Sequence, residues 1–496
     1  MQRLGITILG LWLAIILSAC QSSLQRDVVA TLSNADQTGI RWGLVVANMD
    51  GEELLALRAD DRFTPASNTK IVTTMASYHY LDQLSDPQHN PGTYVTLEPV
   101  DAGDPPDLIL HGGGDAMLTD APDCQSHCLS DLADAVASTG LTEVGHVIGD
   151  DTLFAFERWG PGWSLEDLQF YYGTAVSALS VNDNLVWINV VAGAEAGMPV
   201  SVSWADGDTY YALVNEVTTS PAETDRALRI ARFPGAHMVR VYGTVPAGSQ
   251  DLDFGLAIDN PAEFAALRFK RLLEARGISV SAVRTRHRPL TPLDEVPDEE
   301  TETAALSVHA IEDEAERIAA LAASPLTESL KRISKDSENL HAEIALRRLG
   351  RLEGPGSRDY GLAVFQAFLE TAGITEQEIT LYGGSGMSIY NRISPRAMVR
   401  LLAFAADQPW FEAWLADQPI GGVDGSLERR FVGTALEGKV FAKTGTLNGA
   451  NALSGVMVAA SGQQLLFSII ANDRPPGTGS AIAEMDAALA AIAEHY

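Results

Sequence analysis

Three short motifs built on serine and lysine lie far apart along this chain, and they constrain its fold more than any other feature. Ser67-Asn68-Thr69-Lys70 lies near the N-terminus, Ser337-Glu338-Asn339 in the second half and Lys443-Thr444-Gly445 near the C-terminus. A Ser-x-x-Lys alone is expected about once by chance in a chain of this length, so a single match is weak. All three in this order predict a fold that brings both ends of the chain to one place.

Hydrophobic patterning around the motifs predicts an α+β domain. Asp50-Gly51 between apolar runs is a strong turn signal, so residues 40–58 predict a β-hairpin. A helix is predicted from Ile71 to Leu81, directly after Ser67-Asn68-Thr69-Lys70. Strands from both chain ends should therefore pair in one mostly antiparallel sheet flanked by helices. The strand-like runs near the C-terminus are 438–447, 452–459 and 463–470, and the closing helix is 482–494.

The middle of the chain has a different texture. From about 84 to 306, Gly, Pro and Asp turns alternate with short β-branched runs, with one helix predicted from Pro261 to Arg276. We expect this stretch to be a β-rich insert made of one or two small domains. The outer domain is then split into 28–83 and 307–496. Residues 289–302, which are acidic and rich in proline, predict an exposed loop within this region.

Composition sets the class of protein. A chain of 496 residues with 46% apolar residues predicts two or three globular domains. A net charge of −31 argues against a nucleic-acid partner, because phosphate binding needs a basic face. The run His111-Gly-Gly-Gly-Asp115 lacks the Gly-Lys-Ser/Thr of a phosphate loop. His111 and His341 have no partner at metal-ligand spacing, so we expect neither a metal nor a cofactor.

The first twenty residues predict a targeting segment. Arg3, an apolar run from Leu4 to Leu17 and a small-residue end are typical of a signal peptide over 1–19, and the run is too short to span a bilayer. Leu17-Ser18-Ala19-Cys20 resembles a bacterial lipobox, which implies that Cys20 is lipidated and becomes the first mature residue. Gln21, in place of Asp, points to the periplasmic side of the outer membrane. The alternative is an ordinary signal peptide that contains a cysteine.

The other two cysteines, Cys124 and Cys128, form an even pair in a chain predicted to reach an oxidising compartment. Without a nearby histidine cluster they make a poor zinc site. A small loop disulfide is the favoured interpretation, and two free thiols are the alternative.

The first motif has the composition of an activated nucleophile. Ser67 and Lys70 share one helix face, so the amine can reach the hydroxyl and take its proton. A lysine acts as a base only if its pKa falls from about 10.4 toward neutrality, through burial or a nearby cation. Lys443 is the predicted second cation. The backbone N–H of Ser67, at a helix N-terminus, is predicted to form half of an oxyanion hole.

The other two motifs are predicted to handle the substrate. Ser337 would relay a proton between Lys70 and the leaving group, and Asn339 would orient the substrate backbone. Lys443, with Thr444 and Thr446, suits a terminal carboxylate. Gly445 would let a peptide lie against the strand, and the N–H of Thr446 would complete the oxyanion hole. Taken singly, Ser67 is a helix cap, Ser337 a loop residue and Lys443 a solvated lysine, but three such coincidences in order are improbable.

With these motifs in place, the chain resembles the D-alanyl-D-alanine carboxypeptidase/endopeptidase family known as class C low-molecular-mass penicillin-binding proteins. The resemblance implies a penicillin-binding-protein/β-lactamase-like transpeptidase domain, split by an insert of two small nested β-rich domains. It also implies hydrolysis of peptidoglycan stem peptides and inhibition by β-lactams. Further matching segments are 112–119, 160–172, 178–184, 324–326, 337–343, 421–427 and 443–449.

Departures from the family pattern affect expected specificity. Glu338 replaces the usual Asp, and Gly383–Ser388 replaces Asp-Gly-Ser-Gly-Leu-Ser. A lipid anchor is also not the commonest form. In relatives that read diaminopimelate, an Asp contacts its side-chain amine and an Arg its carboxylate. The resemblance places Asp167, with Tyr172 beside it, at the first position and Ile389 at the second, with Arg392 as a substitute if the loop bends.

Two other functions remain open from the sequence. The same fold serves β-lactamases and esterases, which need an efficient deacylation route. A non-catalytic wall-binding or sensor lipoprotein is the other alternative, although it need not keep all five of the residues assigned to catalysis: Ser67, Lys70, Ser337, Asn339 and Lys443.

Overall fold

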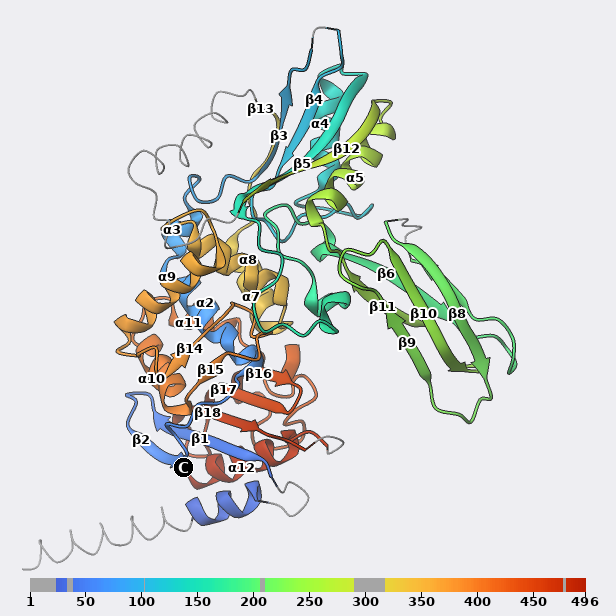
Figure 1. Cartoon of the computed structure of the whole chain (residues 1–496). Coiled ribbons are helices and arrows are strands. Elements are labelled where there is room, and N and C mark those ends of the chain that lie inside the picture. Colours follow the sequence, from blue (N-terminus) through green and yellow to red (C-terminus); the bar gives the residue numbers. More distant parts are fainter. Residues whose placement is uncertain (1–23, 34–38, 102, 206–209, 290–316, 476–478) are drawn as a thin grey trace, which may run out of the picture. The chain divides into compact units, whose positions relative to one another are not determined.

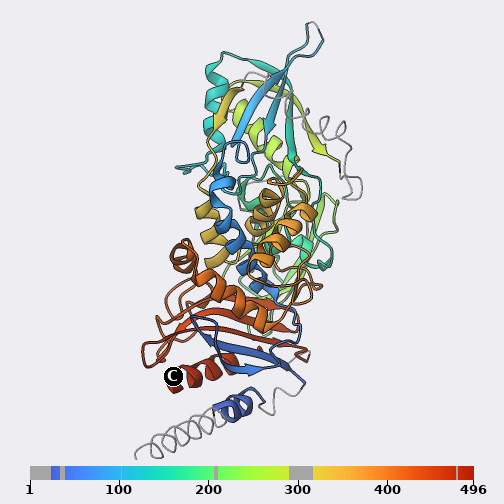
Figure 2. The ribbon, with the colours of Figure 1, turned by 90° about the vertical axis from the view of Figure 1, so that its left-hand side faces the viewer.

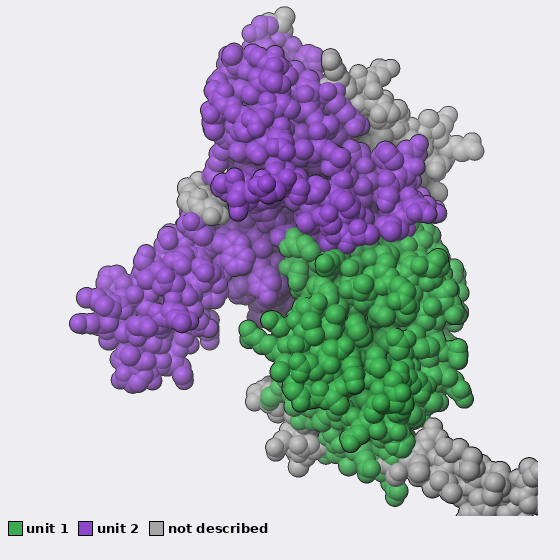
Figure 3. All heavy atoms as spheres, turned by 180° about the vertical axis from the view of Figure 1, so that it is seen from behind, with its two compact units in different colours: residues 1–80, 330–338, 362–496 green, residues 81–329, 339–361 purple. Residues whose placement is uncertain are grey.

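The computed structural model describes residues 24–33, 39–101, 103–205, 210–289, 317–475 and 479–496. The chain forms two compact units, which Figure 3 colours separately: unit 1 comprises 1–80, 330–338 and 362–496, and unit 2 comprises 81–329 and 339–361. The predicted signal peptide, Cys20 and nearly all of the predicted loop 289–302 lie outside the described residues. Among the described helices, none is long and apolar enough to cross a membrane. The boundaries 28–83, 84–306 and 307–496 stay predictions.

Unit 1 is built on a five-stranded sheet whose strands come from both ends of the chain (Figure 1). The spatial order is β16-β17-β18-β1-β2, and every neighbouring pair is antiparallel. The predicted hairpin is confirmed by the pairing of β1 with β2, and the predicted α+β class is confirmed. The strands are β1 (Arg41–Asn48), β2 (Glu53–Leu57), β16 (Val440–Leu447), β17 (Ala450–Val458) and β18 (Gln464–Asn472).

Helices cover both faces of this sheet (Figure 2). On one face, alternate residues such as Leu44 and Phe467 form a core with Leu489 of the closing helix α12 (Ile482–His495) and with a helix over residues 24–32. On the other face, α10 (Pro395–Ala406) packs closely on β1 and β18. Gly43 makes this approach possible, since a Cβ there would lie 2.8 Å from the Pro395 ring.

Helix α2 (Thr69–His79) is the central helix of unit 1. Every residue from 69 to 78 is buried, so the helix has no solvent face and its polar side chains bond inside the protein. Trp414 Nε1, for example, donates to Thr74 Oγ1 at 2.9 Å.

The remaining elements of unit 1 are η2 (Ala66–Asn68), β14 (Ile379–Thr380), β15 (Arg392–Ile393), α11 (Phe411–Ala416) and η6 (Gly425–Leu427). Two further helices, α7 (Leu326–Lys335) and α9 (Arg358–Thr371), have residues in both units.

Unit 2 contains a mixed five-stranded sheet with the order β12-β5-β4-β3-β13. Its apolar face forms a core with α4 and α5, including Leu132 and Phe269. The predicted helix from Pro261 is confirmed as α5 and ends at Glu274. The elements are β3 (Thr93–Glu98), β4 (Asp107–His111), α4 (Leu129–Ser138), β5 (Glu143–Ala155), α5 (Pro261–Glu274), β12 (Ser279–Arg288) and β13 (Arg317–Leu321).

Unit 2 also contains two three-stranded sheets, β8-β10-β9 and β11-β6-β7, whose apolar residues share one core. Their strands are β6 (Leu185–Val191), β7 (Ser201–Trp204), β8 (Ala212–Ser220), β9 (Ala227–Ala231), β10 (Met238–Pro246) and β11 (Leu252–Ala257). The remaining elements are α3 (Leu81–Ser85), η3 (Asp167–Gln169), η4 (Tyr171–Gly173), η5 (Asn182–Asn184) and α8 (Asn339–Gly350).

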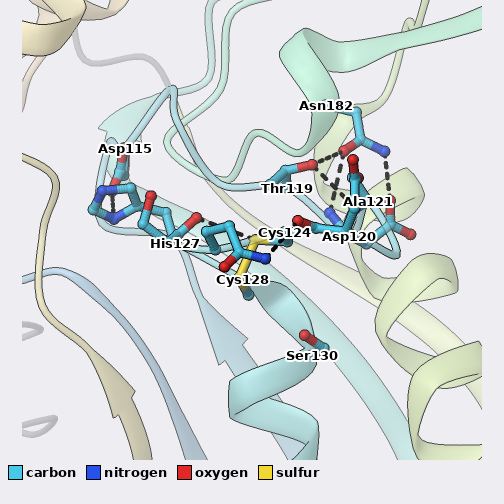
Figure 4. The surroundings of a disulfide bond; sticks show 12 residues. Asp115, Thr119, Asp120, Ala121, Cys124, His127, Cys128, Ser130 and Asn182 are labelled. Carbon is cyan, nitrogen blue, oxygen red and sulfur yellow. Dashed lines mark hydrogen bonds and ion pairs between the residues drawn. A yellow bond between two sulfur atoms is a disulfide. The ribbon is translucent and has the colours of Figure 1, made fainter.

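Cys124 and Cys128 form a disulfide in the structure, with an S–S distance of 2.04 Å (Figure 4). The bridged loop leads into α4, and Thr119 holds its two ends: its N–H donates to His127 O, and its O accepts from Leu129 N–H. The bridge therefore closes a loop whose ends are already tied by backbone hydrogen bonds.

Candidate active site

Ser67 lies in the short turn η2, directly before the buried helix α2. Ala66 has a φ of +49°, a left-handed conformation that non-glycine residues keep only where their surroundings impose it. Two glycines bring other backbone segments against this turn. A Cβ on Gly445 would lie 2.5 Å from Pro65 O, and one on Gly386 would lie 2.1 Å from Ala66 O. Close backbone packing on two sides therefore fixes the position of Ser67.

Lys70 lies one helical turn after Ser67 and is fully buried, at 0% exposure. Its Nζ donates to Ser67 Oγ at 3.0 Å and to Ser385 O at 2.6 Å. Thr73 Oγ1 donates to Gly384 O at 2.6 Å, one turn further along the helix. The amine is thus oriented toward the Ser67 hydroxyl, as the i, i+3 spacing predicts.

The loop Gly383–Ser388, which departs from the family pattern, supports Lys70 through its backbone. The groups that accept from Lys70 and Thr73 are the carbonyl oxygens of Ser385 and Gly384. These contacts do not depend on the side chains of the loop. Loss of the usual Asp therefore leaves this support of Lys70 intact.

Ser337 and Lys443 form a second hydroxyl–amine pair in unit 1. Ser337 follows α7, has a φ of +64° and accepts a hydrogen bond from Lys443 Nζ at 2.9 Å. Lys443 is buried, at 1% exposure. Burial and, next, the charge of Lys70 hold the pKa of Lys443 well below its usual range, while Asp336 acts in the opposite direction. Two serine hydroxyls thus each meet a buried amine, and the two amines repel each other.

Asn68 is a residue of the site that the sequence does not single out. It is fully buried, and its Nδ2 donates to Lys443 O at 2.8 Å. This bond ties the turn η2 to strand β16, and so it holds the first motif against the third. The only signal in the sequence is its place inside the motif, because the carbonyl that it binds has no sequence signature.

Strand β16 lies at the edge of its sheet. Near its start, Phe441 makes an isolated bridge with Ile420, and the N–H of Ala442 donates to Pro419 O. In an antiparallel strand, alternate residues direct their backbone groups to the same side. The N–H groups of residues 444 and 446 therefore point away from β17 too, toward the edge that a further extended chain can join.

The side chains of the third motif lie along this edge. Lys443 Nζ donates to Thr444 O at 3.2 Å, and Thr444 Oγ1 donates to Ser426 Oγ at 2.7 Å. Thr446 Oγ1 accepts from Asn451 Nδ2 at 3.4 Å. Ser426 and Asn451, which the sequence does not predict as site residues, thus orient the two threonine hydroxyls.

Three predicted substrate-binding residues meet in unit 2. Asn339 Nδ2 donates to Tyr172 O at 2.7 Å, and Tyr172 OH donates to Asp167 Oδ1 at 3.2 Å. Burial, more than any other cause, raises the pKa of Asp167 above its ordinary value, although the bond from Tyr172 opposes this. Burial and the neighbouring Asp167 raise the pKa of Tyr172 to about 12. The carboxyl group of Asp167 is therefore half-buried beside a neutral phenol.

The residues considered for the second carboxylate contact lie in unit 1. Ile389 is exposed, at 54%. Arg392 does not reach out in its place: its Nη1 donates to Thr64 Oγ1 at 3.0 Å and to Ile389 O and Asn391 O, each at 2.8 Å. Nη1 of the guanidinium thus binds backbone carbonyls of the loop between Ile389 and β15.

The part of the chain that the structure describes holds no group of three or more His, Cys, Asp or Glu side chains placed to bind a metal ion.

Comparisons with known proteins agree with this arrangement. The chain matches the family described as D-Ala-D-Ala carboxypeptidase 3 (S13) over residues 24–291 and 300–495. A D-alanyl-D-alanine carboxypeptidase of Actinomadura sp. (strain R39) is 32% identical over 491 residues, which cover 96% of this chain and 85% of the relative. A carboxypeptidase DacB of Haemophilus influenzae is 22% identical over 452 residues, covering 88% and 87%.

The fold has a counterpart among solved structures. The crystal structure of penicillin-binding protein 4 (dacB) from Haemophilus influenzae gives a TM-score of 0.75 at 21% identity, and the match covers 94% of this chain and 98% of the other. This likeness supports the predicted penicillin-binding-protein-like fold with its large insert. Together with the family match, it shows that this chain belongs to the D-Ala-D-Ala carboxypeptidase 3 (S13) family.

Proposed function

We propose that this protein is a serine-type D-Ala-D-Ala carboxypeptidase, DD-endopeptidase or both, and that it cleaves peptidoglycan stem peptides through an acyl-enzyme on Ser67. The observation that carries the proposal is the 3.0 Å contact between Lys70 Nζ and Ser67 Oγ in a site that also buries Lys443. A contact between a hydroxyl and a buried amine supplies a nucleophile and its base together. Family membership supports the same reaction.

The first step is attack of Ser67 Oγ on the carbonyl carbon of the penultimate D-alanine. Its proton passes to the uncharged amine of Lys70 as the new C–O bond forms. Because Lys443 and Lys70 are buried and repel each other, the pair does not readily hold two positive charges. The form with Lys70 uncharged is the reactive one. Lys443, in its charged form, keeps the positive field that favours the developing oxyanion.

The second step breaks the peptide bond. We assign the N–H groups of Ser67 and Thr446 to the oxyanion of the tetrahedral intermediate; the edge-facing N–H of Thr446 suits this role. The leaving amine takes a proton through the hydroxyl of Ser337, which is replenished from the lysine pair. Water then hydrolyses the ester by the reverse proton path, regenerating Ser67. In a carboxypeptidase the leaving group is D-alanine, and in an endopeptidase it is the cross-linked partner stem.

Substrate binding uses the open edge of β16. The peptide adds as an extended strand along the edge, and Gly445 offers no side chain that would block it. We assign the terminal carboxylate to Lys443, Thr444 and Thr446. In unit 2, we assign orientation of the substrate backbone to Asn339, and recognition of the amine of the stem side chain to Asp167 with Tyr172.

A fluorescent penicillin tests the nucleophile. Its strained amide resembles the scissile bond, and its leaving group stays tethered, so the acyl-enzyme should persist and be visible on a gel. The Haemophilus influenzae penicillin-binding protein 4 has been solved in complex with a β-lactam, which supports this expectation. Ser67→Ala should abolish labelling, whereas Ser461→Ala, which removes an exposed hydroxyl in the turn between β17 and β18, should keep it. Labelling that survives Ser67→Ala would place the nucleophile elsewhere.

The reaction products separate this function from the alternatives. Purified muropeptides should lose terminal D-alanine or be cut at their cross-links in the wild type, and stay intact with Ser67→Ala. Rapid turnover of penicillin without peptide cleavage would indicate a β-lactamase instead. Binding of penicillin or wall material without any turnover would indicate a sensor protein.

For location, we propose the periplasmic face of the cell envelope, with a lipid on Cys20. The support is the signal-like segment 1–19 and its Leu-Ser-Ala-Cys ending. Several acyl chains on one residue would anchor the protein stably. Mass spectrometry of the mature N-terminus should find a diacyl- or triacyl-modified Cys20; an unmodified start at another residue would exclude the anchor.

A further inference from the structure

The mixed sheet of unit 2 carries a row of side chains that the proposed reaction does not use. The strand register places Tyr94 of β3 opposite His111 of β4, His111 opposite Asp150 of β5, and Asp150 opposite Arg286 of β12. Residues opposite each other project from the same face of a sheet. This face is not the one covered by α5, because Gly149, the neighbour of Asp150, faces the helix: a Cβ there would lie 2.1 Å from its backbone.

A cleft of about 470 Å³ opens over this row. Tyr94 and His111 stack at 4.4 Å between ring centroids, and the guanidinium of Arg317 lies 4.0 Å from the Tyr94 ring centroid. The cleft thus has an aromatic floor with one cation stacked on it. Apolar groups complete the walls; among them are Pro87, Pro91 and Leu153.

Asp150 places an unsatisfied acceptor at this cleft. The side chain is 2% exposed, and its Oδ1 accepts from Thr152 N–H at 2.9 Å and from Thr152 Oγ1 at 2.6 Å. Its buried Oδ2 accepts no hydrogen bond from the described residues; Arg286 Nη1 is 3.7 Å away and His111 Nδ1 3.9 Å. Burial lowers the pKa of His111 to about 4, so this imidazole is uncharged at neutral pH. A buried carboxylate oxygen is thus left without a donor.

Arg317 is the complementary group. It is exposed at the cleft. Its side chain stacks on Tyr94, and among the described residues it makes no hydrogen bond or ion pair. A guanidinium presents five N–H donors in a planar fork that suits a carboxylate. Within the described residues, the cleft therefore combines a buried acceptor that has no donor with an accessible cation that has no anion.

We propose that this cleft is a second binding site, for a peptide that ends in a free carboxylate. The carboxylate of the peptide binds Arg317, and a backbone N–H near the peptide end donates to Asp150 Oδ2. The small side chain of the terminal peptide residue lies against the apolar wall formed by Pro87, Pro91 and Leu153. A neutral sugar offers donors but no anion, and a phosphate offers the anion but no donor for Asp150. The inference rests on the proposed function, because stem peptides present this chemistry, and it gives the insert a role in holding a second stem.

The active site must first be blocked, so that it does not bind the test peptide. Full-length protein is acylated with benzylpenicillin, and a mass increase reports the reaction at Ser67. Isothermal titration calorimetry with N-acetyl-D-Ala-D-Ala then measures the remaining binding. We expect one site per chain, a loss of affinity of about tenfold or more in Arg317→Gln, and a similar loss in Asp150→Asn. The C-terminal amide of the same peptide should bind correspondingly weakly.

Controls keep the two proposals separate. Arg229→Gln, which removes an exposed guanidinium on β9, should leave the binding unchanged. Melting curves of Arg317→Gln should match the wild type, since its side chain is exposed. If penicillin acylates the protein but no further peptide binds, or if Arg317→Gln binds as tightly as the wild type, the second site is excluded and the proposed function stands. If penicillin fails to acylate Ser67, the proposed function fails, and the cleft is still testable by the same titration of Ser67→Ala.

Discussion

Each unit buries a cluster of charged groups, but the two clusters differ in kind. In unit 1, Lys70 and Lys443 are like charges with exposures of 0% and 1%. In unit 2, the neighbours of Asp150 are Arg286 and His111, and this histidine is uncharged at neutral pH. Burying two like charges opposes folding, whereas an acid beside a base offsets part of its own desolvation.

This difference indicates what each cluster is for. A fold gains no stability from two repelling amines, so their burial is explained by a reaction that needs one of them uncharged. The unit 2 cluster is closer to a structural ion pair. The features that indicate a ligand there are Asp150 Oδ2 and Arg317, neither of which has a hydrogen-bond partner among the described residues. The four predictions below test this contrast.

The largest effect is expected from Lys70→Ala. If the unit 1 cluster serves proton transfer, removal of the amine that contacts Ser67 should slow acylation by penicillin about 10²- to 10⁴-fold. The rate constant for acylation, measured by stopped-flow fluorescence, gives this factor directly. The matched change in unit 2, Arg286→Ala, should leave acylation at the wild-type rate. Equal slowing by both variants would mean that Lys70 acts only through the fold.

The second effect concerns the pH dependence of the lysine pair. The wild-type acylation rate should fall as the pH drops, because protonation of the pair removes the base. Lys443→Gln removes the neighbouring amine whose charge opposes protonation of Lys70, so the acid limb of the profile should move to higher pH. Saturating penicillin separates this shift from weaker binding of its carboxylate. An unchanged acid limb would show that the two amines are not coupled.

The third prediction concerns stability in unit 2. Because the pKa of His111 is lowered to about 4 from an ordinary value of 6.5, the unfolded chain takes up a proton that the folded sheet does not. The contribution of the uncharged His111 to the free energy of unfolding is therefore complete above pH 6.5. It is lost as the pH falls toward 4, and the loss is roughly 3 kcal/mol at most. Hydrogen-exchange protection of β3, β4 and β5 at pH 7 and pH 4.5 measures it. His111→Gln should flatten this dependence; equal losses in both proteins would assign it to other groups.

The sequence predicts the two clusters very unequally. The cluster in unit 1 has a sequence motif because the chemistry fixes both the residue types and their spacing; its residues are Ser67, Lys70, Ser337 and Lys443. The pairing of strands from both chain ends follows from the hydrophobic patterns of those strands. The structure brings together the four residues within unit 1. Asn339, from the same motif as Ser337, belongs to unit 2, and this division has no signal in the sequence.

The cluster in unit 2 has no such signature. Tyr94, His111, Asp150 and Arg286 become neighbours only through strand register, including parallel pairings between β4, β5 and β12 that bring together distant parts of the chain. The spacing of residues along the chain predicts no partner for His111, because its neighbours in the fold lie on other strands. Backbone acceptors such as Ser385 O are invisible for a similar reason, since every residue has a carbonyl.

The smallest effect is expected on the selectivity between stem peptides. Asp167 in unit 2 is assigned to the amine of the stem side chain, whereas Ile389 in unit 1 stands where relatives are expected to bind the adjacent carboxylate. Isoleucine neither donates a side-chain hydrogen bond nor carries charge, and Arg392 is bonded to the Ile389 and Asn391 carbonyls. The protein should therefore distinguish free diaminopimelate stems only weakly from amidated or lysine-like stems.

Ile389→Arg should restore the missing contact. Residue 389 is exposed at 54%, so a guanidinium can be added there without disturbing the core. A bidentate guanidinium–carboxylate bond contributes about 1.5–3 kcal/mol, which corresponds to about one to two decades in kcat/KM for the free-carboxylate stem. Steady-state kinetics with both stem types, in the wild type, Ile389→Arg and the neutral control Ile389→Gln, measure the gain. A strong wild-type preference for the free carboxylate, lost in Arg392→Ala, would instead assign the contact to Arg392, which would then have to release the carbonyls that it binds in this structure.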